Sequence, residues 1–353
     1  MRLSERLKDL SPYAPGRSPC EVVLNANESF VLPSPALQQE MAAILNDFPF
    51  NRYPDPRAEE LCKAFADFYK VNWEHVTAGN GSDELIDLLF SCLVASGDKV
   101  LTVRPDFSMY GFGAYMNDVE EVVYQKEDYQ IDVEALLAMA KANDVAMIVF
   151  SNPCNPTGMI LPRTEVVRLI EGFDGIVVVD EAYMDFADES VMDMAGTTAN
   201  LVVLKTFSKA LAMASLRIGM AITTPAMTRL LQTGKAPYNV GRLTQALGTC
   251  VMQHEEELRA GICAVKDSSA NLVAGVEGLV AKYAVLERVL PSATNYVYLI
   301  TPEAKVIFEK MQTKGVLIRQ SAENALRISA GTLEENEKCL QALEAVVKEL
   351  KVS

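Results

Sequence analysis

Short apolar runs alternate with amphipathic stretches through the middle of the chain. Apolar residues at helical spacing predict helices over residues 84–95, 133–142 and 163–173. Short strands are predicted over residues 98–103 and 119–124, and apolar runs predict buried strands over residues 146–153, 175–183 and 201–208. Buried strands that alternate with helices are typical of a mostly parallel sheet with helices on both faces, so we expect an α/β fold.

The two ends of the chain have other patterns. Long amphipathic helices are predicted over residues 254–276 and 334–350, around short strands that lie within residues 294–331, which indicates a smaller α+β domain. The first fifty residues are rich in Pro, Asn and Ser, which favours an irregular arm. We therefore expect three parts: an arm with part of the small domain (residues 1–48), a large α/β domain (49–240) and a small C-terminal domain (241–353).

The charge of the chain narrows the classes of partner. It has 32 basic and 47 acidic residues among 353, a formal net charge of −15. Nucleic acids and anionic membranes bind basic surfaces, so we expect neither as a partner. No apolar run reaches the roughly 18 residues of a membrane span, and the first residues, MRLSERLKDL, lack the apolar core of a signal peptide.

The pattern of cysteines and histidines argues against histidine-centred catalysis and against a metal site. The seven cysteines are scattered and form no CxxC pair, which is typical of reduced thiols in a cytoplasmic protein. We expect a cytoplasmic location for that reason. The only two histidines, His75 and His254, lie in no motif, so the sequence predicts neither histidine-centred catalysis nor a metal site.

Polar residues follow three of the predicted strands at the point where each strand ends. Residues 151–158 read SNPCNPTG, residues 180–183 read DEAY, and residues 206–209 read TFSK, where we expect the strand to lead into a helix. Each segment alone fits ordinary loop chemistry or helix capping. Because parallel strands end at one edge of their sheet, the three together predict a ligand pocket there.

The charged residues at these strand ends indicate one cofactor. A lysine at an apolar rim, Lys209, is a candidate for forming a Schiff base. A carboxylate at the end of the central strand, Asp180, can hold a ring nitrogen in its protonated form. Pyridoxal phosphate needs both groups, and its phenolic oxygen would accept hydrogen bonds from Asn155 and Tyr183.

A phosphate cradle for this cofactor is also visible. Gly79 and Gly81 form a tight turn before Ser82, Asp83 and Glu84 open a helix, whose free N–H groups would bind phosphate. Thr206, Ser208 and Arg217 would complete the shell. The side chain of Phe107 could stack on the cofactor ring, although core packing is the commoner role for a single phenylalanine.

These motifs resemble the fold-type I, pyridoxal-phosphate-dependent aminotransferases. The order of NPCNPTG, DEAY and then TFSK, with an arginine eight residues after the lysine, carries the resemblance. Within the group the chain looks most like the histidinol-phosphate aminotransferases, on the motifs PYAPG, RYPDP and LRISAGT. The resemblance covers nearly the whole chain. It implies a mostly parallel, seven-stranded type of sheet sandwiched by helices, with a smaller α+β domain.

The resemblance also implies roles for individual residues. Lys209 would hold the cofactor and move the substrate proton, with Asp180 and Tyr183 as further catalytic groups. The cofactor would be held by Gly81, Ser82, Asp83 (through its backbone), Phe107, Asn155, Asp180, Tyr183, Thr206, Ser208, Lys209 and Arg217, together with Tyr53 from the second subunit of a homodimer. Arg327 would bind the substrate carboxylate. The side-chain pocket would be lined by Tyr13, Asn239 and Arg319.

Two positions depart from the family pattern. Residues 27–30 read NESF where the family has NENP, so the local turn is expected to differ. Cys154 stands beside Asn155, and we interpret it as a space-filling residue and not as a reactive thiol.

The resemblance implies transamination between L-histidinol phosphate and 2-oxoglutarate, a step of histidine biosynthesis. Three alternatives stay open at this point. The first is an aminotransferase for aromatic or other amino acids, and the second is an O-phospho-amino-acid decarboxylase on the same fold. The third is a regulator that binds the cofactor without turnover, which the intact set of Lys209, Asp180, Asn155, Tyr183 and Arg217 disfavours.

Overall fold

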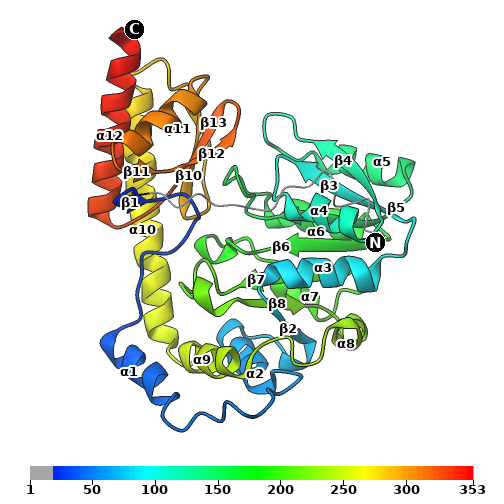
Figure 1. Ribbon diagram of the computed structural model, residues 1–353. Coiled ribbons are helices and arrows are strands. Elements are labelled where there is room, and N and C mark those ends of the chain that lie inside the picture. The colour runs from blue at the N-terminus through cyan, green and yellow to red at the C-terminus, as the bar shows by residue number, and fades with distance from the viewer. Residues whose placement is uncertain (1–18, 353) are drawn as a thin grey trace, which may run out of the picture.

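The computed structural model describes residues 19–352, and its larger part is built on a seven-stranded sheet (Figure 1). The strand order is β2-β8-β7-β6-β5-β3-β4. The sheet consists of β2 (Val76–Asn80), β3 (Lys99–Arg104), β4 (Glu120–Gln125), β5 (Val145–Ser151), β6 (Ile176–Asp180), β7 (Leu201–Thr206) and β8 (Ile218–Ile222). Only β8 runs antiparallel to its neighbours, β7 and β2. The mostly parallel sheet expected from the sequence is thereby confirmed.

Helices cover both faces of this sheet, because successive side chains of a strand point to opposite faces. On β6, Val178 packs in one hydrophobic cluster, while Val177 and Val179 pack in the other. The first face carries α3 (Ser82–Leu93), α4 (Met109–Met116) and α8 (Pro225–Gly234). The second face carries α2 (Glu59–Tyr69), α5 (Val133–Ala142), α6 (Arg163–Glu171) and α7 (Met192–Ala195).

A second, four-stranded antiparallel sheet forms a separate core. Its order is β12-β13-β10-β9, with β9 (Arg288–Val289), β10 (Tyr296–Ile300), β12 (Arg319–Ala322) and β13 (Ala325–Ser329). A short parallel pair, β1 (Val22–Val23) and β11 (Val316–Leu317), adds the N-terminal segment to this unit. The helices α11 (Ala304–Thr313) and α12 (Leu333–Val352) complete it.

One long helix, α10 (Glu255–Val280), contributes to both cores. Figure 1 shows it running from α9 (Arg242–Met252) up to the side of α12. Its side chains up to Val265 pack with the large sheet, whereas Leu272 and Val276 pack with the small one. The domain division expected at residue 240 stays a prediction. Among the described residues no helix is both long and apolar enough to cross a bilayer.

Shorter elements complete the larger part. The helix α1 (Pro35–Ala43) lies beside α9, and single turns of 3-10 helix form η2 (Trp73–His75), η3 (Met184–Phe186) and η4 (Ala214–Leu216).

The segment after β7 differs from the expected strand-to-helix junction. Instead of an α-helix, the chain makes turns and η4, and then returns as β8. Ala212 and Arg217 adopt positive φ angles of 57° and 51°, which a continuous right-handed helix does not allow. The backbone N–H of Phe207 donates to Ile218 O at 3.0 Å, which closes the loop. The lysine of interest, Lys209, therefore lies in a turn.

Candidate active site

Three parallel strands bring their polar carboxyl ends to one edge of the large sheet. In the register of β5, β6 and β7, Ser151 lies opposite Asp180, and Asp180 lies opposite Leu204. The segments SNPCNPTG, DEAY and TFSK therefore leave the sheet side by side. This arrangement brings the polar residues of the predicted pocket together.

Asp180 is buried and accepts two hydrogen bonds. Its Oδ2 accepts from the hydroxyl of Tyr110 at 2.9 Å, and its Oδ1 accepts from the backbone N–H of Ala182 at 3.1 Å. Burial raises the pKa of Asp180 to about 6, against the opposing effect of these two donors. No cation is paired with this carboxylate among the described residues. Tyr110, which the sequence analysis did not single out, is also fully buried.

Lys209 and Tyr183 lie close together. Asn27, from the N-terminal segment, connects Tyr183 with the small sheet. The Nζ of Lys209 donates to Ala26 O at 3.0 Å and lies 5.9 Å from the centre of the Tyr183 ring. The Tyr183 hydroxyl accepts from Nδ2 of Asn27 at 2.8 Å. Asn27 also contacts Ser329 of β13 through its backbone N–H and its Oδ1. The segment NESF thus begins with a buried residue that links both parts of the protein.

Asn155 and Arg327 join the small sheet to the loop after β5. The Nη1 of Arg327 donates to Asn155 Oδ1 at 2.6 Å, and its Nη2 donates to Asn25 O at 3.0 Å. The guanidinium carbon lies 5.4 Å from the centre of the Tyr296 ring. The Nε of Arg327 is buried and has no hydrogen-bond partner. This donor remains available to an acceptor that the protein itself does not supply.

The residues expected to bind the cofactor phosphate lie together at the start of α3. Gly81 has a φ of +82°, and a Cβ at this position would lie 2.6 Å from Arg217 Nη2, so the turn requires glycine. Arg217 donates to Ser208 Oγ at 3.3 Å and to Asp83 Oδ2 at 3.1 Å. Asp83 therefore contacts Arg217 through its carboxylate. Ser82 is the first residue of α3.

Thr206 stabilises the neighbouring turn. Its Oγ1 donates to Ile218 O at 3.3 Å and accepts from the backbone N–H of Ser208 at 3.1 Å. Its hydroxyl is therefore used within the protein, and its expected contact with the cofactor phosphate stays a prediction.

The remaining predicted residues lie in several places. Phe107 is half-buried, and its ring centre lies 5.7 Å from that of Tyr110 in an edge-to-face arrangement.

Tyr53 is 77% exposed and stacks on Tyr238 with ring centres 4.6 Å apart. Asn239 donates to Ala78 O and Glu84 and accepts from Lys235, so its amide is occupied. Tyr13 lies outside the described residues.

Arg319 lies directly opposite Arg327. The two residues are register partners on the antiparallel strands β12 and β13, and Arg319 is exposed. Like charges at directly opposite positions of a strand pair destabilise it. An anion near both side chains would offset that repulsion.

A buried charged network behind the loop was not found from the sequence. Asp106 accepts from the backbone N–H of Phe107 at 2.7 Å and from both the N–H and the hydroxyl of Ser151. Lys126 Nζ lies 3.7 Å from Asp106 Oδ2 and donates to the sulfur of Cys154 at 3.1 Å. Ser151 Oγ in turn accepts from the N–H of Asn155 at 2.9 Å. The network fixes the loop that carries Asn155.

The environment of Cys154 bears on its chemistry. Burial raises the pKa of this thiol. A neutral thiol is a weak nucleophile, which supports the interpretation of Cys154 as a space-filling residue.

Comparisons with known proteins cover nearly the entire chain. The sequence model for aminotransferase class I and II matches residues 20–343. A histidinol-phosphate aminotransferase of Clostridium kluyveri is 33% identical over 349 residues, which are 98% of each chain. The crystal structure of histidinol-phosphate aminotransferase from Sinorhizobium meliloti in complex with pyridoxal-5'-phosphate has a TM-score of 0.88 at 23% identity, with 99% of this chain and 98% of that chain covered.

The same fold occurs in a protein with another named activity. The crystal structure of L-threonine-O-3-phosphate decarboxylase from Porphyromonas gingivalis has a TM-score of 0.79 at 22% identity, with 93% of this chain and 99% of that chain covered. At such identities a structural likeness establishes the fold, and the choice of reaction depends on the site.

Proposed function

The chain belongs to the aminotransferase class I and II family, and on that premise we propose that it transfers the amino group of L-histidinol phosphate to 2-oxoglutarate, with pyridoxal 5'-phosphate as its cofactor. The observation that carries the choice of substrate is the full-length similarity to relatives with that activity in their names. The geometry of the site supports the chemistry, residue by residue.

The surroundings of Asp180 fit the ring of the cofactor. A buried carboxylate without a cationic partner is costly, and its raised pKa of about 6 reflects that cost. A protonated ring nitrogen would supply the missing charge and would restore the ionised form of Asp180. When bound, pyridoxal phosphate supplies an electron sink for the reacting carbon of an amino acid. Asp180 sustains this property by keeping the ring nitrogen protonated.

The start of α3 fits the phosphate of the cofactor. Backbone N–H groups at a helix N-terminus bind anions, and here Arg217 and the hydroxyl of Ser208 stand beside the helix that begins at Ser82. The close approach of Gly81 to Arg217 leaves room for no side chain. We expect the phosphate to compete with Asp83 for the guanidinium of Arg217.

Lys209 has the position of the base. Its Nζ reaches the edge of the sheet and is held by a single backbone acceptor, Ala26 O, at 3.0 Å. Lys209 would hold the cofactor through this amine. Once the amino donor displaces it, the free amine would take the proton from the α-carbon of the donor. The hydroxyl of Tyr183 and the amide of Asn155 lie at the same strand ends and would orient the ring.

The paired arginines of the small sheet support an acidic substrate. The unpartnered, buried Nε of Arg327 offers a donor to a carboxylate, and an arginine fork binds a carboxylate through two parallel hydrogen bonds. Arg319 lies opposite on β12 and adds a second positive charge. One substrate carries a phosphate and the other a second carboxylate, so a site with two arginines serves both half-reactions.

A homodimer is part of the proposal. Phe50 and Tyr53 are 72% and 77% exposed, and both belong to an irregular segment between α1 and α2. Large apolar side chains that gather on a surface favour a protein interface. We expect the face with Tyr53 to contact a second copy, so that Tyr53 reaches the cofactor phosphate of the partner subunit. The cytoplasmic location stays a prediction from the cysteine pattern.

A screen of amino donors tests the proposed substrate. The purified enzyme would be mixed with single donors, and the change of the cofactor's absorption would be followed before and after addition of 2-oxoglutarate. L-Histidinol phosphate should give the highest kcat/KM. A preference for unphosphorylated aromatic donors would replace the proposal with a general aminotransferase, and release of carbon dioxide from an O-phospho-amino acid would replace it with a decarboxylase.

A further inference from the structure

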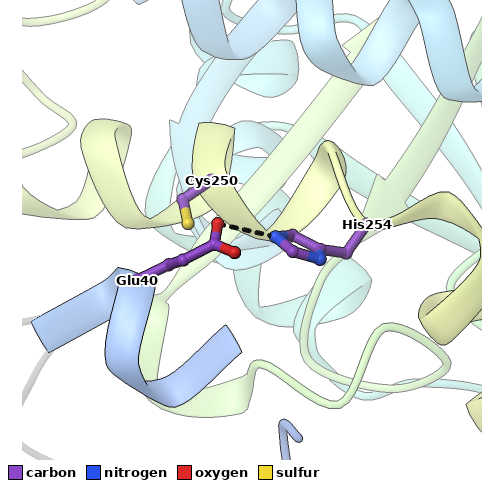
Figure 2. A group of neighbouring side chains, drawn as sticks. All are labelled: Glu40, Cys250 and His254. Atoms are coloured by element: carbon purple, nitrogen blue, oxygen red, sulfur yellow. Dashed lines mark hydrogen bonds and ion pairs between the residues drawn. The ribbon is translucent and has the colours of Figure 1, made fainter. Parts of the chain in front are cut away.

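Away from the site of the proposed function, three metal-ligating side chains converge where α1 meets the junction of α9 and α10. Glu40 belongs to α1, Cys250 to α9, and His254 is the residue before α10. One ligand atom of each residue lies within 4.8 Å of the other two. Figure 2 shows the carboxylate of Glu40 between the sulfur of Cys250 and the ring of His254.

The geometry points to a site for a divalent transition-metal ion, of which Zn²⁺ is the representative, with Glu40, Cys250 and His254 as its three protein ligands. Carboxylate, thiolate and imidazole are the ligand types that zinc takes in proteins. A carboxylate and a thiolate carry two negative charges and would neutralise a divalent cation. Three protein ligands leave the fourth position to a water molecule.

The distances are compatible with this coordination after small side-chain movements. Nε2 of His254 lies 3.0 Å from Oε2 of Glu40. Metal–ligand bonds of about 2.0–2.3 Å in a tetrahedron place the ligand atoms roughly 3.5 Å apart. The sulfur of Cys250 must therefore approach its two neighbours by at most about 1.3 Å.

The backbone positions of the three ligands are well fixed. Cys250 and His254 are four residues apart, and the chain between them keeps right-handed helical angles at Gln253, so both side chains lie on one face. The start of α1 is held by Glu257 of α10, which accepts from the backbone N–H of Ser34 at 2.7 Å and from its hydroxyl at 2.8 Å. Glu40, one turn and a half further along α1, is therefore held opposite His254.

In the single chain, before a second copy covers the face that carries Tyr53, this cluster is open to solvent. The side chain of Glu40 is 57% exposed and that of His254 is 26% exposed. Glu40 and Cys250 also line a cavity of about 910 Å³, which is bordered by Tyr53 and Arg242 as well. Among the described residues, the side chain of Glu40 has one hydrogen-bond partner, His254, so coordination would exchange one contact for three metal bonds.

This site could not be predicted from the sequence, because its three ligands are far apart in the chain. Glu40 is separated from Cys250 by 210 residues, and only folding places α1 beside α9. The prediction that the chain has no metal site depended on the lack of a histidine motif, and a site formed by packing between helices leaves no such motif. A bound ion would hold α1, and with it the segment that carries Tyr53, against the start of α10.

The test uses the full-length protein after treatment with a chelator. Zn²⁺ would be titrated by calorimetry, and Co²⁺ would be followed in the red region of the spectrum, where four-coordinate cobalt absorbs and the cofactor does not. We expect one ion per chain and the intense bands of four-coordinate cobalt. Cys250→Ser and His254→Gln should weaken Zn²⁺ binding by at least about 100-fold, since even the loss of an outer-shell partner costs about 10–100-fold. Cys263→Ser, which changes an exposed cysteine of α10, should leave binding unchanged.

A second measurement needs no variant. Zn²⁺ should protect Cys250 from alkylation in the wild-type protein, while Cys263 in the same molecules is modified at an unchanged rate. Weak cobalt bands typical of six-coordinate ions, binding that survives Cys250→Ser, or equal alkylation of Cys250 with and without Zn²⁺ would each overturn the proposal.

Discussion

Replacing Tyr110 by Phe tests how the buried carboxylate of Asp180 is held. The change removes one hydroxyl from a fully buried ring and with it the 2.9 Å hydrogen bond to Asp180 Oδ2. Only the bond from the N–H of Ala182 to the other carboxylate oxygen remains. Because the shape of the side chain is kept, packing against α3 and the sheet should change little.

The magnitude follows from the pKa of Asp180 in the cofactor-free protein. Burial raises this pKa from its ordinary value of 3.8 to about 6, so the folded state binds the proton more tightly than the unfolded state. Stability therefore falls as the pH rises from 3.8 to about 6, by about 3 kcal/mol in total. A hydrogen bond to a charged group contributes about 1.5–3 kcal/mol. Its loss should raise the pKa by a further one to two units and extend the fall in stability to roughly pH 7–8.

The assay is thermal unfolding of the cofactor-free protein between pH 5 and 9. The melting temperature of Tyr110→Phe should continue to fall from pH 6 to pH 8, relative to wild type, and Asp180→Asn should remove this difference. In the enzyme with bound pyridoxal phosphate, the acidic limb of the plot of kcat against pH should move to higher pH. Parallel pH profiles for wild type and Tyr110→Phe would show that the hydroxyl does not stabilise the ionised carboxylate of Asp180, because a lost packing contact shifts the melting temperature equally at every pH.

Four further predictions concern the proposed activity. Lys209→Ala should retain the cofactor through its phosphate contacts but lose nearly all turnover, and borohydride reduction of wild type should attach the cofactor to Lys209, as peptide mapping can check. Tyr53→Phe should weaken cofactor binding by about 1.5–3 kcal/mol in equilibrium titrations, and a fully active monomer would contradict its role across the interface. Arg327→Lys should lower kcat/KM for 2-oxoglutarate strongly, because lysine cannot form the two parallel bonds. Arg319→Ala should affect L-histidinol phosphate more than an uncharged aromatic donor, and equal losses on both would remove Arg319 from the phosphate site.

Local sequence patterns predicted five of the seven strands of the large sheet, and they missed the two strands at its antiparallel end, β2 and β8. The apolar runs that became β5, β6 and β7 are buried on both faces, so burial alone specifies them. The helix expected over residues 133–142 has those bounds, since Asp132 caps it and Asn143 ends it. The turn around Lys209 was not predicted, because its positive φ angles at Ala212 and Arg217 occur at residues that carry no glycine-like signal.

The candidate site was predictable only where a motif carried it. Tyr110 lies three residues after Phe107 in the same segment, and nothing in the local pattern distinguishes a buried tyrosine that packs from one that donates to Asp180. Asp106 and Lys126 belong to none of the motifs that the sequence analysis used, although their side chains are only 1–2% exposed. Such a buried ion pair cannot be predicted from the sequence, because only the folded protein brings the two charges together, where each compensates the burial of the other.

Arg327, the proposed carboxylate-binding residue, also joins the small sheet to two neighbouring loops. Its Nη1 is occupied by Asn155 and its Nη2 by Asn25, while the buried Nε has no partner. A buried donor without an acceptor costs about 1–3 kcal/mol, so this cost is present in the protein before any substrate arrives. A carboxylate that approaches Nε would remove it, and to use both of its oxygens it must take one Nη group from Asn155 or Asn25. Either exchange loosens a contact between β13 and the neighbouring loops at the moment when substrate binds. If Arg327 binds the substrate carboxylate as proposed, substrate binding would therefore change the contact between Arg327 and Asn155, whose loop is proposed to hold the cofactor.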